Sequence, residues 1–378
     1  MAALFVFENN AAIQQFNNKA VQPFTLPLPF SNPQIFKLLH RLLPTLLLLQ
    51  CSLLNAQTLG GNAVFGFLGQ PNTAQLSALG GVNISAIGND VGMSFPNPAL
   101  LRPGMHKQVN TSFNAFLAGI RNYSATGAYH FERSATSLAA GVNYFDYGTI
   151  PQTDASGNVL GSFRPVDYVV QLMASRRYHE RFWYGGTMKY LRSGYGPYTS
   201  SGIAFDIGIS YYDSANGLQV SLLAKNMGTQ LKAYNGSRKE ELPFDLQAGI
   251  TKRLRHAPLQ FSLTAHHLQQ FNQYYNDTLF RSSEGEPGYA AGSAMQKIFS
   301  HLVLSAQAFL NEKLHVSAGY HFQRRQDLNA FNYTSGLNGF TFGASVLLRK
   351  IHLHYATGFY QRNLFHQLSL GFNWGGAL

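Results

Sequence analysis

The feature that most constrains this chain is a strict alternation of apolar with small or polar residues in its C-terminal half. Leu368 and Leu370 alternate with Ser369 and Gly371, and the pattern recurs along 314–323. Successive side chains of a β-strand point to opposite sides, so each segment has one apolar and one polar face. The segments are roughly ten residues long, enough for a tilted strand to cross a bilayer. The pattern predicts a transmembrane β-barrel, in which Arg is tolerated better at Ser369 than at Leu370.

The composition agrees with a membrane barrel. Charged residues are only 12% of the 378 residues, which is about half the usual share in a globular protein. Aromatic residues reach 13%, as the interfacial girdles of such a barrel require. The mean hydropathy of −0.10 fits an apolar outer face offset by a polar lumen, and no run is long enough for a membrane-spanning helix.

Residues 36–56 are typical of a secretion signal. Lys37 and Arg41 precede a short leucine-rich stretch, and a small residue stands at the expected cleavage point. We therefore expect 1–56 to be an N-terminal extension and signal peptide. The only cysteine, Cys51, lies within it, so the exported chain would carry no disulfide.

Fourteen segments fit the strand pattern, so the fold class is predicted to be all-β, with a 14-stranded antiparallel barrel over 107–378. The predicted strands are 107–116, 123–131, 137–147, 167–178, 182–195, 200–213, 218–227, 244–254, 259–268, 299–310, 314–325, 340–349, 351–360 and 365–374.

The connections between these segments are sorted by parity. Every even connection is short, and the odd ones include all the long ones, namely 148–166, 228–243, 269–298 and 326–339. Short periplasmic turns and long outer loops are typical of outer-membrane barrels. A barrel of this size also has a lumen too wide for its own side chains to fill, so something should occupy it.

Residues 57–106 have the size of a plug for that lumen. They are rich in Gly and Pro, and they fit neither a long helix nor a full membrane strand. The run Leu79–Ser85, Asp90-Val91 and Asn97–Leu101 are the elements that stand out.

These elements resemble the start of the PorQ/PorV family of the type IX secretion system, and more distantly the FadL-like transporter barrels. Lys225-Asn226-Met227-Gly228, placed at the end of a middle strand, matches another element of the group. The resemblance covers about residues 57–378 and implies an N-terminal hatch inside a FadL-like barrel. The hatch residues that it indicates are Gly80, Gly81, Asn83, Asp90, Asn97 and Pro98.

The resemblance implies a non-enzymatic component of the type IX machinery in the outer membrane of a Gram-negative member of the Bacteroidota. As partners it implies lipids and lipopolysaccharide of that membrane, a PorZ-like surface protein and the PorU/PorV complex. The loop 269–298 is expected to hold the surface protein through aromatic side chains of the kind found at interface cores. These are Phe271, Tyr274, Tyr275, Phe280 and Tyr289.

The alternative function is that of a FadL-like transporter of hydrophobic small molecules. It requires an apolar binding pocket, whereas the inferred lumen faces are mostly Gly, Ser, Asn, Gln and His. Fold-level analogy supports both functions, and a fold does not fix a function.

The net charge of +11 raises the question of nucleic acid, but no basic helix or stacking motif accompanies it. Much of the charge falls on the short-turn side. This positive charge fits a solvated periplasmic rim. The alternative hypothesis is a basic ring that contacts a periplasmic partner. The residues are Arg176, Arg177, Arg181, Arg253, Arg255, Arg349 and Lys350.

No enzymatic, metal or cofactor site is expected. His352 and His354 share a strand face, but a metal site needs three or four ligands and no third is evident. His266 and His267, as neighbours on a strand, would point to opposite faces. No Gly-x-Ser-x-Gly motif is present. The carboxylates of Asp90, Asp206 and Asp245 are expected to pair with lumen Arg or Lys and hold the hatch.

Overall fold

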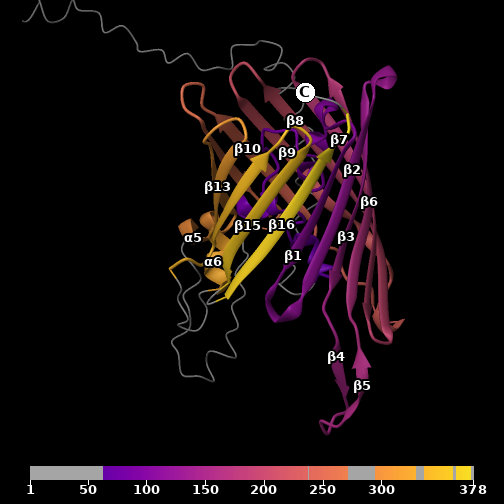
Figure 1. Cartoon of the computed structure of the whole chain (residues 1–378). Helices are drawn as coiled ribbons and strands as arrows, with labels where there is room; N and C mark the ends of the chain where they lie inside the picture. The colour runs from indigo at the N-terminus through magenta and orange to yellow at the C-terminus, as the bar shows by residue number, and fades with distance from the viewer. Residues whose placement is uncertain (1–62, 237, 271–293, 329–335, 361–362, 376–378) are drawn as a thin grey trace, which may run out of the picture. The chain divides into compact units, whose positions relative to one another are not determined.

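Fourteen antiparallel strands close into a barrel, as predicted (Figure 1). The computed structural model describes residues 63–236, 238–270, 294–328, 336–360 and 363–375. The barrel strands are β1 Gln108–Ala115, β2 Arg121–Phe131, β3 Thr136–Asp146, β6 Val166–Tyr178, β7 Phe182–Tyr195, β8 Tyr198–Asp213, β9 Leu218–Lys232, β10 Asp245–Arg253, β11 Leu259–Ala265, β12 Leu302–Phe309, β13 Leu314–His321, β14 Phe340–Leu347, β15 Ile351–Tyr360 and β16 Asn363–Asn373. Pairing of β1 with β16 closes the sheet, which therefore has no free edge to leave unpaired in hydrocarbon.

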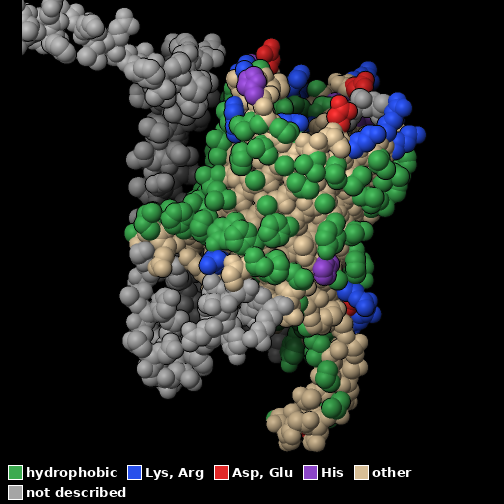
Figure 2. Space-filling view, turned by 60° about the vertical axis from the view of Figure 1, so that its left-hand side comes forward, with side chains coloured by type: hydrophobic (Ala, Val, Ile, Leu, Met, Phe, Trp, Pro, Cys, Tyr) green, Lys and Arg blue, Asp and Glu red, His purple; other side chains and the backbone are tan. Residues whose placement is uncertain are grey.

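The burial pattern has the polarity of a membrane barrel. On β16, Leu368 is 52% exposed, whereas Gln367 and Ser369 are each 1% exposed. The inward faces are small and polar and the outward faces are apolar. Figure 2 shows this belt of hydrophobic side chains around one face of the barrel, with Lys and Arg gathered mainly at one end.

The sorting of the connections by parity is confirmed. The even connections span three to five residues each, namely 132–135, 179–181, 214–217, 254–258, 310–313 and 348–350. The long connections 147–165, 233–244, 266–301 and 322–339 all leave the opposite end of the barrel. That end is the outer one in barrels of this kind.

Three predicted boundaries are wrong. β9 continues to Lys232, which shortens the following loop. The segments expected to extend β12 and β13 are instead short helices, α5 Ala294–Ser300 and α6 Phe322–Leu328. In α6 the alternation stops, and Gln and Arg, which are good helix formers, take its place. The connection 147–165 contains a separate hairpin, β4 Ile150–Thr153 and β5 Val159–Phe163, which extends away from the barrel (Figure 1).

Residues 63–106 form short turns with little regular structure. They are η1 Gly66–Gly69, α3 Ala74–Ala78, η2 Val91–Ser94, η3 Pro98–Leu100 and η4 Pro103–Met105. Asn97 caps η3, and the side chains of Thr73 and Asp90 cap α3 and η2. Further single turns are η5 Leu117–Gly119, η6 Glu132–Ser134 and η7 Tyr234–Gly236. Within the described ranges, no helix has the length and apolar character needed to cross a membrane.

The apolar belt predicts that the stability cost of a charged substitution depends strongly on its depth in the bilayer. Leu172 lies at the middle of β6 and Leu310 lies in the turn after β12, and each is 61% exposed. We expect Leu172→Arg to lower the free energy of unfolding by about 2–4 kcal/mol and Leu310→Arg by about 0–1 kcal/mol, because the cost of a buried guanidinium falls toward the interface. Denaturant unfolding in lipid vesicles, followed by the heat-modifiable gel shift, measures both. Equal losses at the two positions would contradict the membrane placement.

Candidate functional site

The segment 63–106, here called the plug, is tied to the inner wall on many sides. Ala74 N donates to Ser369 Oγ over 2.8 Å, and Gly80 N donates to Thr341 Oγ1 over 3.1 Å. Other strands contribute equivalent contacts. They are Ser124 Oγ to Asn72 O, Gln171 Nε2 to Phe95 O, Lys225 Nζ to Leu68 O, Ser85 Oγ with Thr251 Oγ1, and Asn83 Nδ2 to Ser305 Oγ. The wall thus supplies partners for buried plug groups that no helix or sheet satisfies.

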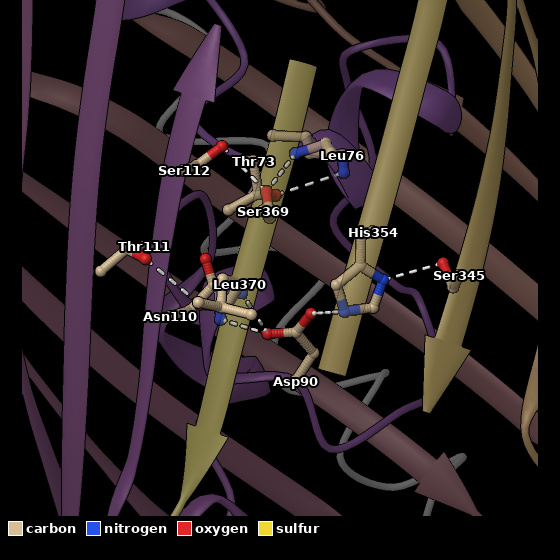
Figure 3. Close-up of polar contacts among 12 residues, drawn as sticks. Thr73, Leu76, Asp90, Asn110, Thr111, Ser112, Ser345, His354, Ser369 and Leu370 are labelled. Carbon is tan, nitrogen blue, oxygen red and sulfur yellow. Dashed lines mark hydrogen bonds and ion pairs between the residues drawn. The ribbon is translucent and has the colours of Figure 1, made fainter. Parts of the chain in front are cut away.

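A second group of ties gathers on Asp90. Its carboxylate accepts hydrogen bonds from Gly92 N at 2.8 Å and Asn110 Nδ2 at 3.2 Å. Its Oδ2 atom lies 3.0 Å from His354 Nε2, and His354 Nδ1 lies 2.8 Å from Ser345 Oγ (Figure 3). An acid, a histidine and a serine therefore stand in a row, which the sequence did not indicate. Since His354 and Ser345 are buried and only 11% of the Asp90 side chain is exposed, we interpret the row as an anchor.

Glycines let the plug approach the wall. A Cβ atom at Gly319 of β13 would lie 2.1 Å from Gly80 N, and one at Gly208 of β8 would lie 2.3 Å from Asn97 Oδ1. Gly80 itself has φ of 89°, which favours glycine. Plug backbone approaches the wall at Gly319 and the Asn97 side chain approaches it at Gly208, so the wall needs residues without side chains there.

The structure brings the predicted hatch residues together within the plug. Gly81 has φ of 87°, and a Cβ there would lie 2.7 Å from the Arg324 side chain. Asn83 donates to β12, while Asn97 Nδ2 donates to Ile84 O at 2.8 Å and orders the turn that Pro98 begins.

The expectation that Arg is tolerated at Ser369 does not hold in this structure. Ser369 is 1% exposed and bonds the plug through Ala74, so a long cation there would displace the plug. Ser305 likewise accepts a hydrogen bond from the plug, from Asn83 Nδ2. The polar face is therefore a packed interface rather than a water-filled surface.

A cavity of about 330 Å³ remains between the plug and the outer half of the wall. Its lining includes Lys189, Lys225, Asp245 and Arg324 together with three histidines, His266, His267 and His321. Gln70 and Asp327, also in its lining, are exposed at the outer end. The cavity is thus polar, carries charges of both signs and is reachable from outside.

One side of the cavity is built by a buried ion pair. Lys189 Nζ of β7 lies 2.6 Å from Asp206 Oδ2 of β8, and both side chains are almost fully buried. Lys189 also donates to Asn226 Oδ1, and Asn226 N donates to Asp206 Oδ1. Asn226 has φ of 59°, and the register of β8 with β9 shifts beside it. A bulge therefore aims these polar groups inward.

Two expectations about this region are corrected. The element Lys225-Asn226-Met227-Gly228 lies inside β9 and not at its end. Its glycine is required because a Cβ at Gly228 would lie 2.0 Å from Ile203 O. Asp206 does pair with a lysine, but that lysine belongs to the neighbouring strand, so the pair holds the wall together and does not hold the hatch.

The expectation that His266 and His267 point to opposite faces is also wrong. Their ring centroids lie 4.8 Å apart, and ligand atoms of both rings and of Asp245 all fall within 4.8 Å of one another. His267 has φ of 53°. The left-handed residue breaks the alternation that the sequence argument assumed.

The predicted basic residues all lie exposed at the short-turn end. They are Arg176, Arg177, Arg181, Arg253, Arg255, Arg349 and Lys350. Some of them connect neighbouring turns, since Arg181 pairs with Asp213 at 3.2 Å and Arg255 donates to Ala215 O. A partner for this rim stays a prediction. The loop aromatics Phe271, Tyr274, Tyr275, Phe280 and Tyr289 lie outside the described residues.

Comparisons with known proteins reveal similarity at the level of the fold. No protein-family model and no curated protein matches the chain. The solved structure of a TodX deltaS2S3 mutant monoaromatic hydrocarbon channel superposes with a TM-score of 0.50 at 12% identity, covering 80% of this chain and 99% of that one. The CymD monoaromatic hydrocarbon channel gives 0.45 at 13% identity, covering 82% and 97%. A Pseudomonas aeruginosa FadL homologue gives 0.46 at 8% identity, covering 80% and 98%. The chain thus shares the fold of the TodX channel barrel.

The fit of the plug to the wall predicts that alanine substitutions at two adjacent glycines of β7 differ in their effect on stability and conductance. A Cβ at Gly185 would lie 2.7 Å from Pro98 C, whereas one at Gly186 has no neighbour nearer than 3.8 Å. We expect Gly185→Ala to destabilise the protein by about 1–3 kcal/mol through overpacking. It should also raise the conductance of the barrel in planar bilayers, because the plug loosens. Gly186→Ala is the control and should do neither. An unchanged conductance and stability in Gly185→Ala would show that the plug does not seat against this strand.

Proposed function

We propose that this protein is a plugged outer-membrane channel that admits a small polar, preferentially anionic solute. The cavity between plug and wall carries the proposal. It is concave, it is reached from the outer end, and several polar groups converge on it, which are the usual marks of a small-molecule site. The fold shared with the TodX channel supports a channel, although the solute named for that protein is a hydrocarbon.

The lining argues against a hydrophobic solute of the kind that the sequence analysis considered. Lys225, Arg324 and the histidines would have to lose water to meet an apolar molecule, at a cost that such a molecule cannot offset. Within the cavity, Lys189 is matched by Asp206, whereas Lys225 makes one hydrogen bond, to a neutral carbonyl of Leu68. Lys225 has no carboxylate within ion-pair distance among the described residues, and it is the lining group that would attract an anion.

Passage through the barrel requires the plug to move. The plug is held by separate hydrogen bonds to many strands and by one anchor of several groups on Asp90. Each neutral bond contributes only about 0.5–1.5 kcal/mol, so partial release along one side costs far less than expulsion of the whole segment. We propose partial release as the gate.

Solute uptake into vesicles that contain the purified full chain tests the proposal. We expect small carboxylates to enter faster than neutral or apolar compounds of the same size. Lys225→Met should slow carboxylate entry by roughly tenfold, because local charge concentrates the solute. Lys232→Met removes a lysine from the same strand outside the cavity and should have no effect. A barrel that passes none of these solutes would refute the channel.

A second candidate is the surface anchor of the type IX secretion system that the sequence resemblance implies. The hairpin β4–β5 favours it, because this hairpin extends from the outer end with Val159 67% and Leu160 66% exposed (Figure 1). Its turn is ordered by Asp154, whose carboxylate accepts hydrogen bonds from Ser156 N and Asn158 N. The side chain of Asn158 lowers the pKa of that carboxyl. Apolar side chains on an ordered hairpin outside the bilayer suit a protein partner.

The anchor predicts that a PorZ-like surface protein co-purifies with the barrel from outer membranes. Val159→Ser with Leu160→Ser should release it without unfolding the barrel, since both side chains are exposed. Leu231→Ser, another exposed apolar position near the outer end, is the control. A barrel that retains its partner in the double variant, or that never has one, would speak against the anchor and leave the channel as the function.

A further inference from the structure

Three side chains on the outer half of the cavity wall converge without an assigned task. They are Asp245 at the start of β10 and His266 and His267 just after β11, and their ligand atoms lie within 4.8 Å of one another. We propose that Asp245, His266 and His267 bind a divalent transition-metal ion, with Zn²⁺ as the type case. The proposal does not depend on the passage of any solute.

The backbone places both histidines on the same side. Ala265 pairs with Ala248 in regular antiparallel register, so His267 should be opposite Leu246. Instead Leu268 N donates to Leu246 O at 3.0 Å, one residue later than the register requires. One residue is therefore inserted at the end of β11, where His267 has φ of 53°. An insertion of this kind re-aims side chains and is frequent next to functional sites.

One of the two ring nitrogens of His266 lacks a hydrogen-bond partner. The side chain is almost fully buried, and its Nε2 atom has no hydrogen-bond partner among the described residues. A buried polar atom left without a partner is costly, and a metal ion is one partner that would satisfy it. The backbone of His266 is fixed, since its N donates to His301 O and its O contacts His301 Nδ1.

The ligand set suits a borderline metal. Two imidazoles and one carboxylate are ligands that Zn²⁺ uses in sites that keep a further position open. Metal–ligand distances of about 2.0–2.2 Å bring neighbouring ligand atoms to roughly 3.3 Å in a tetrahedron. The three side chains must therefore close by about 1.5 Å, which side-chain rotation of the half-buried His267 can supply. His321 lies beside this group, with its ring centroid 4.9 Å from that of His266.

Hydrogen bonds from neighbouring groups already orient the Asp245 carboxylate. Gln247 Nε2 donates to Asp245 Oδ2, and His267 N donates to Asp245 Oδ1 at 2.6 Å. Support of this kind around a ligand is a regular part of metal sites. The other cluster, His352 and His354 with Asp90, is a poorer candidate because both ring nitrogens of His354 already have a partner within the plug anchor.

Equilibrium dialysis of the full-length barrel in detergent, after removal of metal with a chelator, tests the site with Zn²⁺ alone. We expect one equivalent of bound Zn²⁺. His266→Gln and His267→Gln should each weaken binding at least about tenfold, since loss even of an outer partner weakens metal sites by 10–100-fold. His352→Gln is the matched control and should bind as the unaltered chain does. Co²⁺ in place of Zn²⁺ should give visible bands of low-coordinate geometry that the first two variants lack.

The heat-modifiable gel shift identifies any variant that fails to fold, and His267→Gln is the milder change because His267 is half-buried. No bound Zn²⁺ in the unaltered barrel would overturn the proposal. So would equal binding by the folded His266→Gln and His267→Gln variants, or a loss in His352→Gln as large as theirs. Dialysis detects the ion at equilibrium, so its outcome is separate from that of the uptake experiment.

Discussion

The hydrogen bonding between plug and wall is the interaction on which the rest of this structure depends. A barrel of fourteen strands encloses more space than its own side chains fill. The plug fills it with a segment that has little regular structure, so many of its backbone groups need partners from elsewhere. Ser369 and Thr341 supply such partners, and Gly319 supplies clearance for Gly80. The small polar residues of the inner face thus contact the plug and not water.

Two bulges determine where charged and imidazole side chains gather in this packed interior. Regular strands present one residue type to the lumen and another to lipid. At Asn226 and at His267 the backbone enters the left-handed region, and the local register shifts. Charged and imidazole side chains from neighbouring strands then meet at one cavity, with Lys189 and Asp206 at the first bulge and Asp245 beside the second. The same device therefore forms both halves of the candidate site.

The two candidate functions use opposite features of the outer end. A channel depends on the cavity and on a plug that can release part of its hold, whereas an anchor depends on the rigid exposed hairpin and gains from a plug that never moves. The anchor on Asp90 links the plug to two strands at once, through Asn110 of β1 and His354 of β15. Its strength decides how easily a gate could open, so the plug interface is common to both hypotheses.

The sequence by itself determined the class of fold, the strand number and the sorting of the loops, because alternation with period two is a local property of each segment and closure follows from the absence of water in hydrocarbon. Through a resemblance it also predicted Gly80, Asn83, Asp90 and Asn97 as plug residues. Only the tertiary structure decided which wall residue meets each of them, and it placed Ser345, His354 and Asp90 in one row. It also overturned the view of His266 and His267 as residues on opposite faces. A single inserted residue reverses the facing of every side chain after it. The hydropathy pattern around two adjacent histidines does not indicate such an insertion.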